Sequence, residues 1–128
     1  MLTLGWHDFE QAVETVVSSC AGQTFAGVYG VPRGGLVLAV VLSHRLGLPL
    51  LLEPCPGCLV VDDVYESGQT LAPFRELPGA RVWVWVSKAE PQWWQAALVT
   101  PSREWIVFPW ENVTAAVADE QQYRAARA

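Results

Sequence analysis

The spacing of apolar and polar positions changes several times along the chain and predicts alternating helices and strands. Apolar residues recur at helical spacing after Asp8, which predicts an amphipathic helix that ends before Gly22. Residues 36–45 are apolar on nearly every side, which is typical of a buried helix. The predicted strands are 25–30, 48–52, 58–61, 81–86 and 105–108. A loop over 62–70 is predicted to open a helix that runs to about residue 77, and two further helices are predicted at 92–98 and 113–128.

This order of elements predicts an α/β fold, a mostly parallel twisted sheet flanked by helices, in a single domain over residues 1–128. In such sheets, ligands bind beyond the carboxyl ends of the strands. Two glycine-containing loops, 31–35 and 62–70, each follow a predicted strand. Both loops are therefore expected at one edge of the sheet, where a site would lie.

Composition narrows the classes of function. The net charge of −5 argues against nucleic-acid binding, which needs a basic face. No apolar run is long enough to span a membrane and the amino terminus does not resemble a signal peptide, so a cytoplasmic protein is expected. Seven Trp residues, with Trp93 and Trp94 in a polar-flanked segment, suggest an apolar patch covered in a homodimer or homotetramer.

The 62–70 loop carries a dense set of polar groups. Two adjacent carboxylates, Asp62 and Asp63, suit ribose hydroxyls and Mg²⁺, which prefers oxygen ligands. The turn that follows offers the Ser67 and Thr70 hydroxyls, and Gly68 lets the backbone approach a ligand closely. At a helix start, such a turn is a cradle for a monophosphate. The alternative, that these residues only cap a helix, accounts for one or two of them but not for the whole set.

The 31–35 loop adds a second anion site. Arg33 can donate in a fork to a diphosphate, and Gly34 and Gly35 expose backbone N–H groups to it. Taken alone, Arg-Gly-Gly more often marks an ordinary turn. Its position before the acidic segment strengthens the interpretation as a binding loop.

Residues 60–70 resemble the signature of the type I phosphoribosyltransferases. That signature has two or three aliphatic residues, two acids, two variable residues, an acid, Ser or Thr, Gly, any residue and Thr, and every fixed position matches. The 31–35 loop is similar to the family's pyrophosphate loop. The resemblance implies that Arg33 and Gly34 hold pyrophosphate and that the phosphoribosyl group is held by Asp62, Asp63, Glu66, Ser67, Gly68, Gln69 and Thr70.

The resemblance extends to the purine branch of this family. Lys88, at the end of a predicted strand, resembles the Lys that contacts a purine's exocyclic oxygen. Trp105 looks like the aromatic residue that stacks on the base, and Ile106 like the residue whose carbonyl reads its edge. The alternative is that Trp105 is a core aromatic and Lys88 a solvated strand end.

Together these resemblances imply a purine-salvage enzyme. It would transfer the phosphoribosyl group of 5-phosphoribosyl 1-pyrophosphate to guanine, xanthine or hypoxanthine, forming a nucleoside monophosphate. Mg²⁺, held partly indirectly by Asp62 and Asp63, would be the cofactor, and Glu66 would accept the proton of the base unless it is simply an acid at a helix start.

The segment 53–58 departs from the family pattern. Family enzymes usually have a longer flexible loop here that covers the reacting sugar, so a non-catalytic nucleotide-binding regulator is an alternative function. The segment also contains Cys55 and Cys58, which are compatible with a redox pair or half a zinc site. A turn with two thiols is favoured, because the pair enters a strand and no second ligand pair follows.

Overall fold

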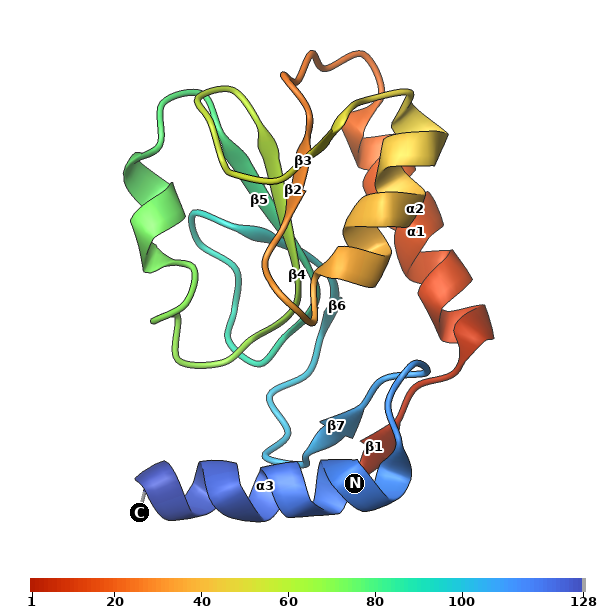
Figure 1. Cartoon of the computed structure of the whole chain (residues 1–128), viewed down its shortest axis with the longest axis vertical. Coiled ribbons are helices and arrows are strands. Elements are labelled where there is room, and N and C mark those ends of the chain that lie inside the picture. Colours follow the sequence, from red (N-terminus) through yellow and green to blue (C-terminus); the bar gives the residue numbers. More distant parts are fainter. Residues whose placement is uncertain (128) are drawn as a thin grey trace. The chain divides into compact units, whose positions relative to one another are not determined.

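The computed structural model describes residues 1–127 and divides into two compact units (Figure 1). Residues 11–102 form the larger unit. Residues 1–10 and the segment from Arg103 onward form the smaller unit. Each unit is described separately, and the prediction of a single domain over 1–128 stays a prediction.

The larger unit is built on a five-stranded sheet in which every pair of neighbours is parallel, in the order β3-β2-β4-β5-β6. This arrangement confirms the predicted α/β fold with a mostly parallel sheet. The strands are β2 (Val28–Gly30), β3 (Leu50–Leu51), β4 (Leu59–Tyr65), β5 (Arg81–Ser87) and β6 (Gln95–Val99).

Helices cover both faces of this sheet. Figure 1 shows α1 (Trp6–Cys20) and α2 (Leu36–Leu46) on one side and η1 (Ala72–Glu76) on the other. The predicted burial of α2 is confirmed at Leu38, Ala39 and Leu42, which are inaccessible to solvent. Burial of these side chains is the main force that holds the layers together.

One of the seven tryptophans is buried in the core on the η1 side of the sheet. Trp94 is 3 % exposed and belongs to a cluster of buried residues from β4, β5 and the η1 segment. The expectation that Trp93 and Trp94 form an exposed patch is therefore wrong for Trp94, because its ring fills space beneath the sheet. The other members of the cluster are Val31, Cys58, Val60, Leu71, Val82 and Val84.

Three local predictions in this unit are corrected. The 62–70 loop begins later than expected, because β4 stays paired with β5 as far as Tyr65 and Ser87. The helix expected to run to about residue 77 is the five-residue 3₁₀ helix η1, with Pro73 in its first turn. The helix predicted at 92–98 is instead the strand β6, because the exposed edge of β5 offers a backbone partner that sequence periodicity does not reveal.

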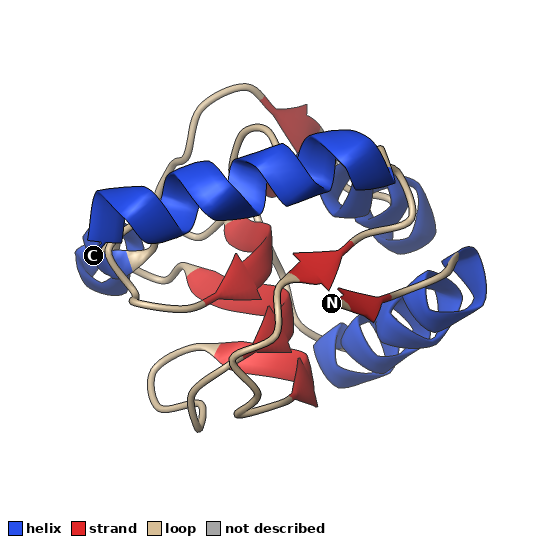
Figure 2. Ribbon diagram, turned by 90° about the horizontal axis from the view of Figure 1, so that it is seen from below, coloured by secondary structure: helices blue, strands red, loops and turns tan. Residues whose placement is uncertain are grey.

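The smaller unit combines a two-stranded parallel sheet with a helix. Its strands are β1 (Leu2–Thr3), which the sequence pattern did not predict, and β7 (Ile106–Val107), a shorter form of the strand predicted at 105–108. Figure 2 shows this pair together with α3 (Val113–Arg127), which confirms the helix predicted at 113–128. Ala128 lies outside the described residues.

Aromatic side chains form the core of the smaller unit. The Trp110 ring stacks on Phe108 with centroids 5.4 Å apart and meets Phe9 edge-on at 5.8 Å. Among residues 1–127, no helix has the length and apolar character needed to cross a membrane.

Candidate active site

The two loops singled out from the sequence meet at the carboxyl edge of the larger sheet. The Val31 N–H donates to the Val61 carbonyl at 2.9 Å. A Cβ atom at Gly34 would overlap the Asp63 carboxylate, and one at Gly35 would overlap the Val61 carbonyl. Only glycine permits so close an approach, so the 31–35 loop lies directly against the acidic end of β4.

The 31–35 loop presents a cationic side chain to solvent. The Gly35 N–H donates to the Val31 carbonyl at 2.8 Å, and the Pro32–Arg33 peptide bond is cis. Arg33 is exposed, and its guanidinium makes no ion pair or hydrogen bond within residues 1–127. The loop thus has an uncommitted fork of donors beside the two carboxylates, as an anion site requires.

Asp62 and Asp63 occupy an environment that disfavours negative charge. Asp62 is 7 % exposed, and burial together with the neighbouring Asp63 raises the pKa of its carboxyl to about 8. Burial also raises the pKa of Asp63. The Asp63 N–H donates to Asp62 Oδ1 at 2.8 Å, which fixes the first carboxyl against the backbone. A buried carboxyl beside a second, partly buried one creates a strong preference for a proton or a cation.

Residues 67–70, called the phosphate turn after the role predicted from the sequence, lie just after the end of β4. Gly68 has φ +82°, a left-handed conformation that favours glycine, and its carbonyl accepts from the Ala72 N–H at 2.9 Å. Ser67, Gln69 and Thr70 are exposed. Only the short η1 follows the turn, so the α-helix dipole expected to favour an anion there is absent.

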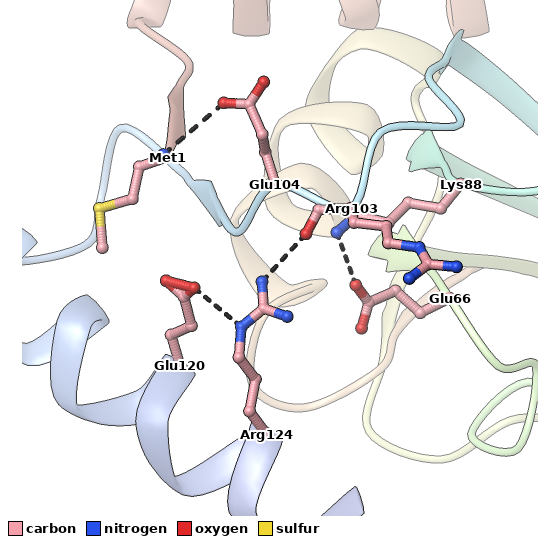
Figure 3. A network of polar contacts seen from close by, with 7 residues as sticks. All are labelled: Met1, Glu66, Lys88, Arg103, Glu104, Glu120 and Arg124. Atoms are coloured by element: carbon pink, nitrogen blue, oxygen red, sulfur yellow. Dashed lines mark hydrogen bonds and ion pairs between the residues drawn. The ribbon is translucent and has the colours of Figure 1, made fainter. Parts of the chain in front are cut away.

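Glu66 and Lys88 form an ion pair that the sequence pattern did not predict. Lys88 Nζ lies 2.7 Å from Glu66 Oε1, and the two side chains are 14 % and 24 % exposed (Figure 3). The backbone brings them together, because the Lys88 N–H donates to the Tyr65 carbonyl at 2.9 Å. Each residue directly follows a strand, and the pairing of β4 with β5, which the sequence does not reveal, places the two side by side.

Trp105 and Ile106 lie in the smaller unit. Trp105 packs on Tyr123 with ring centroids 5.3 Å apart, and its buried Nε1 has no hydrogen-bond partner among the described residues. The carbonyls of Trp105 and Val107 both accept from β1, so alternation along β7 turns the Ile106 carbonyl the other way. That carbonyl is directed away from the β1–β7 pairing.

The segment 53–58 leads from the carboxyl end of β3 back to the amino-terminal edge of the larger sheet, where β4 begins. The Gly57 carbonyl accepts from Ala26 at 3.0 Å, and its N–H donates to Pro78 at 2.8 Å, both of which precede their strands. Cys55 and Cys58 are free thiols in a turn, as favoured from the sequence, with the Cys58 N–H 3.2 Å from the Cys55 carbonyl. The 55–58 turn therefore lies at the edge opposite the acids.

The acidic pair fits Mg²⁺ held together with a substrate. Within residues 1–127, no group of three or more His, Cys, Asp or Glu side chains is arranged to hold a metal by itself. Mg²⁺, however, commonly takes one or two carboxylates and completes its shell with water and phosphate oxygens. Burial and the neighbouring Asp63 raise the pKa of Asp62, and the positive charge of a cation would offset both causes.

A parallel sheet whose carboxyl edge carries a glycine loop, paired acids and a Ser-Gly-Gln-Thr turn is the type I phosphoribosyltransferase fold. The xanthine-guanine phosphoribosyltransferase of Chromohalobacter salexigens is 25 % identical over 134 residues, which cover 85 % of this chain and 83 % of that protein. No protein-family model matches the chain.

Solved structures agree with this assignment. The purine phosphoribosyltransferase of Pyrococcus horikoshii has a TM-score of 0.71 and 26 % identity, with 87 % of this chain and 94 % of that chain covered. The xanthine-guanine-hypoxanthine phosphoribosyltransferase of Helicobacter pylori has a TM-score of 0.73, with coverage of 92 % and 98 %; at 18 % identity it supports the fold alone.

These comparisons confirm the resemblance found in the sequence. The chain has the type I phosphoribosyltransferase fold, and the proteins it resembles are mainly purine phosphoribosyltransferases. The prediction of an enzyme is confirmed on the same basis. The alternative of a non-catalytic regulator is not favoured.

Proposed function

We propose that this protein transfers the phosphoribosyl group of 5-phosphoribosyl 1-pyrophosphate to a 6-oxopurine. The observation that carries the proposal is the contact of Gly34 with Asp63, which joins the pyrophosphate loop to the ribose-binding acids at one edge. A protein that bound only a nucleoside monophosphate would have no use for a loop of this kind beside the acids. Guanine, xanthine and hypoxanthine are the candidate bases.

The larger unit supplies the groups that hold the phosphoribosyl donor. Residues 67–70 bind the 5′-phosphate, and Asp62 and Asp63 bind the ribose hydroxyls. Arg33 and Gly34 bind the pyrophosphate. Because the transition state resembles an oxocarbenium ion, catalysis consists of holding the sugar in position and stabilising the separating charges.

Mg²⁺ is the proposed cofactor, with Asp62 and Asp63 as its protein contacts, partly through water. Bound there, the ion would neutralise the pyrophosphate as it leaves. The two carboxyls would be deprotonated in that complex, since the positive charge of a cation would offset the burial and neighbouring negative charge that raise their pKa values.

Glu66 and Lys88 are proposed to act on the purine. In the reaction, the bond between C1′ and the pyrophosphate oxygen breaks, a bond from C1′ to a purine nitrogen forms, and the proton of that nitrogen passes to Glu66. Lys88 donates to the exocyclic oxygen of the base. Their ion pair at 2.7 Å keeps both side chains in place in the absence of a base.

Trp105 and Ile106 are proposed to complete base recognition. The Trp105 ring stacks on the purine, and the Ile106 carbonyl accepts a hydrogen bond from its edge. Support for the second role comes from the orientation of β7, which turns this carbonyl away from β1.

An activity screen tests the proposal. The full chain is incubated with 5-phosphoribosyl 1-pyrophosphate, Mg²⁺ and each of guanine, xanthine, hypoxanthine, adenine and uracil, and nucleotide and pyrophosphate are both quantified. Formation of a 6-oxopurine nucleotide with equal pyrophosphate is expected. Turnover of adenine alone, or of no base, would refute the substrate assignment.

We also propose a cytoplasmic homodimer or homotetramer. Leu50 and Leu52, at the β3 edge, are 43 % and 92 % exposed, and such apolar surface favours burial against a second copy. Sedimentation at micromolar concentration is expected to give a mass above that of the 14.1 kDa chain. A monomer there would contradict the proposed assembly.

A further inference from the structure

Tyr65 is the last residue of β4 and separates the acidic pair from the phosphate turn. Its ring lies flat on the indole of Trp94, with centroids 3.7 Å apart and an interplanar angle of 11°. Such a stack combines apolar burial with a defined relative orientation of the two rings.

The Trp94 ring is itself fixed. It is 3 % exposed, and its Nε1–H donates to Ser87 Oγ at 3.1 Å. The Ser87 hydroxyl in turn donates to the Ala89 carbonyl at 2.6 Å. Trp94 therefore provides a rigid surface for Tyr65, because both its ring packing and its polar atom are satisfied.

Tyr65 touches two parts of the site from this position. Its hydroxyl lies where a Cβ atom of Gly68 would be, and its Cζ is 2.8 Å from that place. Its backbone carbonyl accepts from the Lys88 N–H at 2.9 Å. One residue thus contacts the phosphate turn through its side chain and the strand end that bears Lys88 through its backbone.

We propose that Tyr65, braced by Trp94, is a positioning residue that sets the conformation of the 67–70 turn for a sugar phosphate. The inference rests on the proposed function, in that it takes this turn as the phosphate site. The turn has few other restraints: the Gln69 N–H donates to Ser67 Oγ at 3.4 Å, and the Ala72 N–H bonds the Gly68 carbonyl. The tyrosine side chain limits how far Gly68 can move toward the sheet.

Binding of ribose 5-phosphate, measured by calorimetry, tests the inference without requiring turnover. Tyr65→Leu removes the stack and should weaken binding about tenfold or more, whereas Tyr65→Phe keeps the stack and should weaken it about two- to fivefold. Trp94→Phe should fall between them. Tyr29→Leu is the matched control, because Tyr29 packs on Phe74 in the same core at 5.9 Å, whereas the side-chain atoms nearest to Gly68 belong to Tyr65.

Thermal denaturation of each variant separates positioning from folding. Tyr29→Leu should lower the melting temperature while leaving ribose 5-phosphate affinity within about twofold of wild type. If Tyr65→Phe and Tyr65→Leu bind as wild type does, or if wild type binds no ribose 5-phosphate, the inference is overturned. Wild-type binding without turnover would refute the proposed transferase activity and leave the role of Tyr65 standing.

Discussion

The two edges of the larger sheet are formed by the ends of the same parallel strands, but they carry different side chains. At the carboxyl edge, Arg33, Asp62, Asp63, Glu66 and Lys88 are gathered from three neighbouring strand ends. At the amino edge, the chain turns tightly through 55–58. The order of strands creates both edges, but the groups proposed to bind phosphate, sugar and cation all lie at the carboxyl edge.

Glycine shows this difference most clearly. At Gly34, the absent side chain leaves room for the Asp63 carboxylate, whereas a Cβ atom at Gly57 would have no neighbour within 4 Å. Gly57 is required only for its φ of +77°. Gly34 is therefore needed for the close approach of Asp63, and Gly57 is needed for the backbone conformation of its turn.

The largest effect is expected from Gly34→Ala. Its new methyl group overlaps Asp63, so the loop or the acid must move, and kcat/KM for 5-phosphoribosyl 1-pyrophosphate should fall about a hundredfold or more. Gly57→Ala is the control, with a cost of about 1–2 kcal/mol in stability and unchanged activity per folded molecule. Equal losses of activity in both variants would remove the functional distinction between the edges.

Asp62→Asn should change how stability depends on pH. A folded-state pKa of about 8, above the ordinary 3.8, means that the folded chain favours the protonated acid. This stabilisation is complete below about pH 4 and is lost as the pH rises toward 8, at up to about 1.4 kcal/mol per pH unit. Asparagine is neutral at every pH, so the variant should lose much of this slope.

The measurement is chemical denaturation from pH 4 to 9 with no Mg²⁺ or substrate present. Glu53→Gln, which removes the same charge from an exposed position outside the acidic pair, is the matched control and should follow the wild-type curve. A flat wild-type curve would contradict the electrostatic account of the acidic pair. Added Mg²⁺ should reduce the wild-type slope more than that of Asp62→Asn.

Lys88→Gln should relax the choice of base. An ammonium donates only, so it favours an exocyclic oxygen, whereas an amide can donate or accept. The ratio of kcat/KM for guanine over adenine should fall about 10- to 100-fold in the variant. Lys88→Arg keeps the charge opposite Glu66 and should preserve the preference, and an unchanged ratio in Lys88→Gln would place the base elsewhere.

Sequence patterns predicted the parts of the molecule that depend on local spacing. The α/β order, the burial of 36–45 and the meeting of 31–35 with the acids followed from periodicity and parallel topology. The patterns failed where pairing with a strand distant in the sequence decides the secondary structure of a segment. Residues 92–98 read as a helix but pair with β5, and the isolated β1 exists only because β7 lies beside it.

The same limit applies within the site. Asp62, Asp63 and Lys88 were identified by type and position, but the Glu66–Lys88 ion pair required knowing that β4 and β5 are neighbours. The stack of Tyr65 on Trp94 depends on ring placement and has no signature in spacing. The candidate residues could thus be selected from the sequence, and their roles stay predictions, whereas the contacts between them came from the fold.

The smallest effect on activity is expected at the amino edge, from Cys58→Ser. Cys58 is inaccessible to solvent and lies in the core cluster with Val60 and Val82, so a hydroxyl there should cost about 1–3 kcal/mol of stability. Cys55→Ser, at a less buried position, should cost less. Activity per folded molecule should be unchanged in both variants, because this turn lies away from the acids.

Burial raises the pKa of the Cys58 thiol and lowers its reactivity, so mild oxidation should also leave wild-type turnover unchanged. If oxidation instead changed turnover and the double serine variant were resistant, Cys55 and Cys58 would be a redox pair, and the amino edge would control the site at the opposite edge.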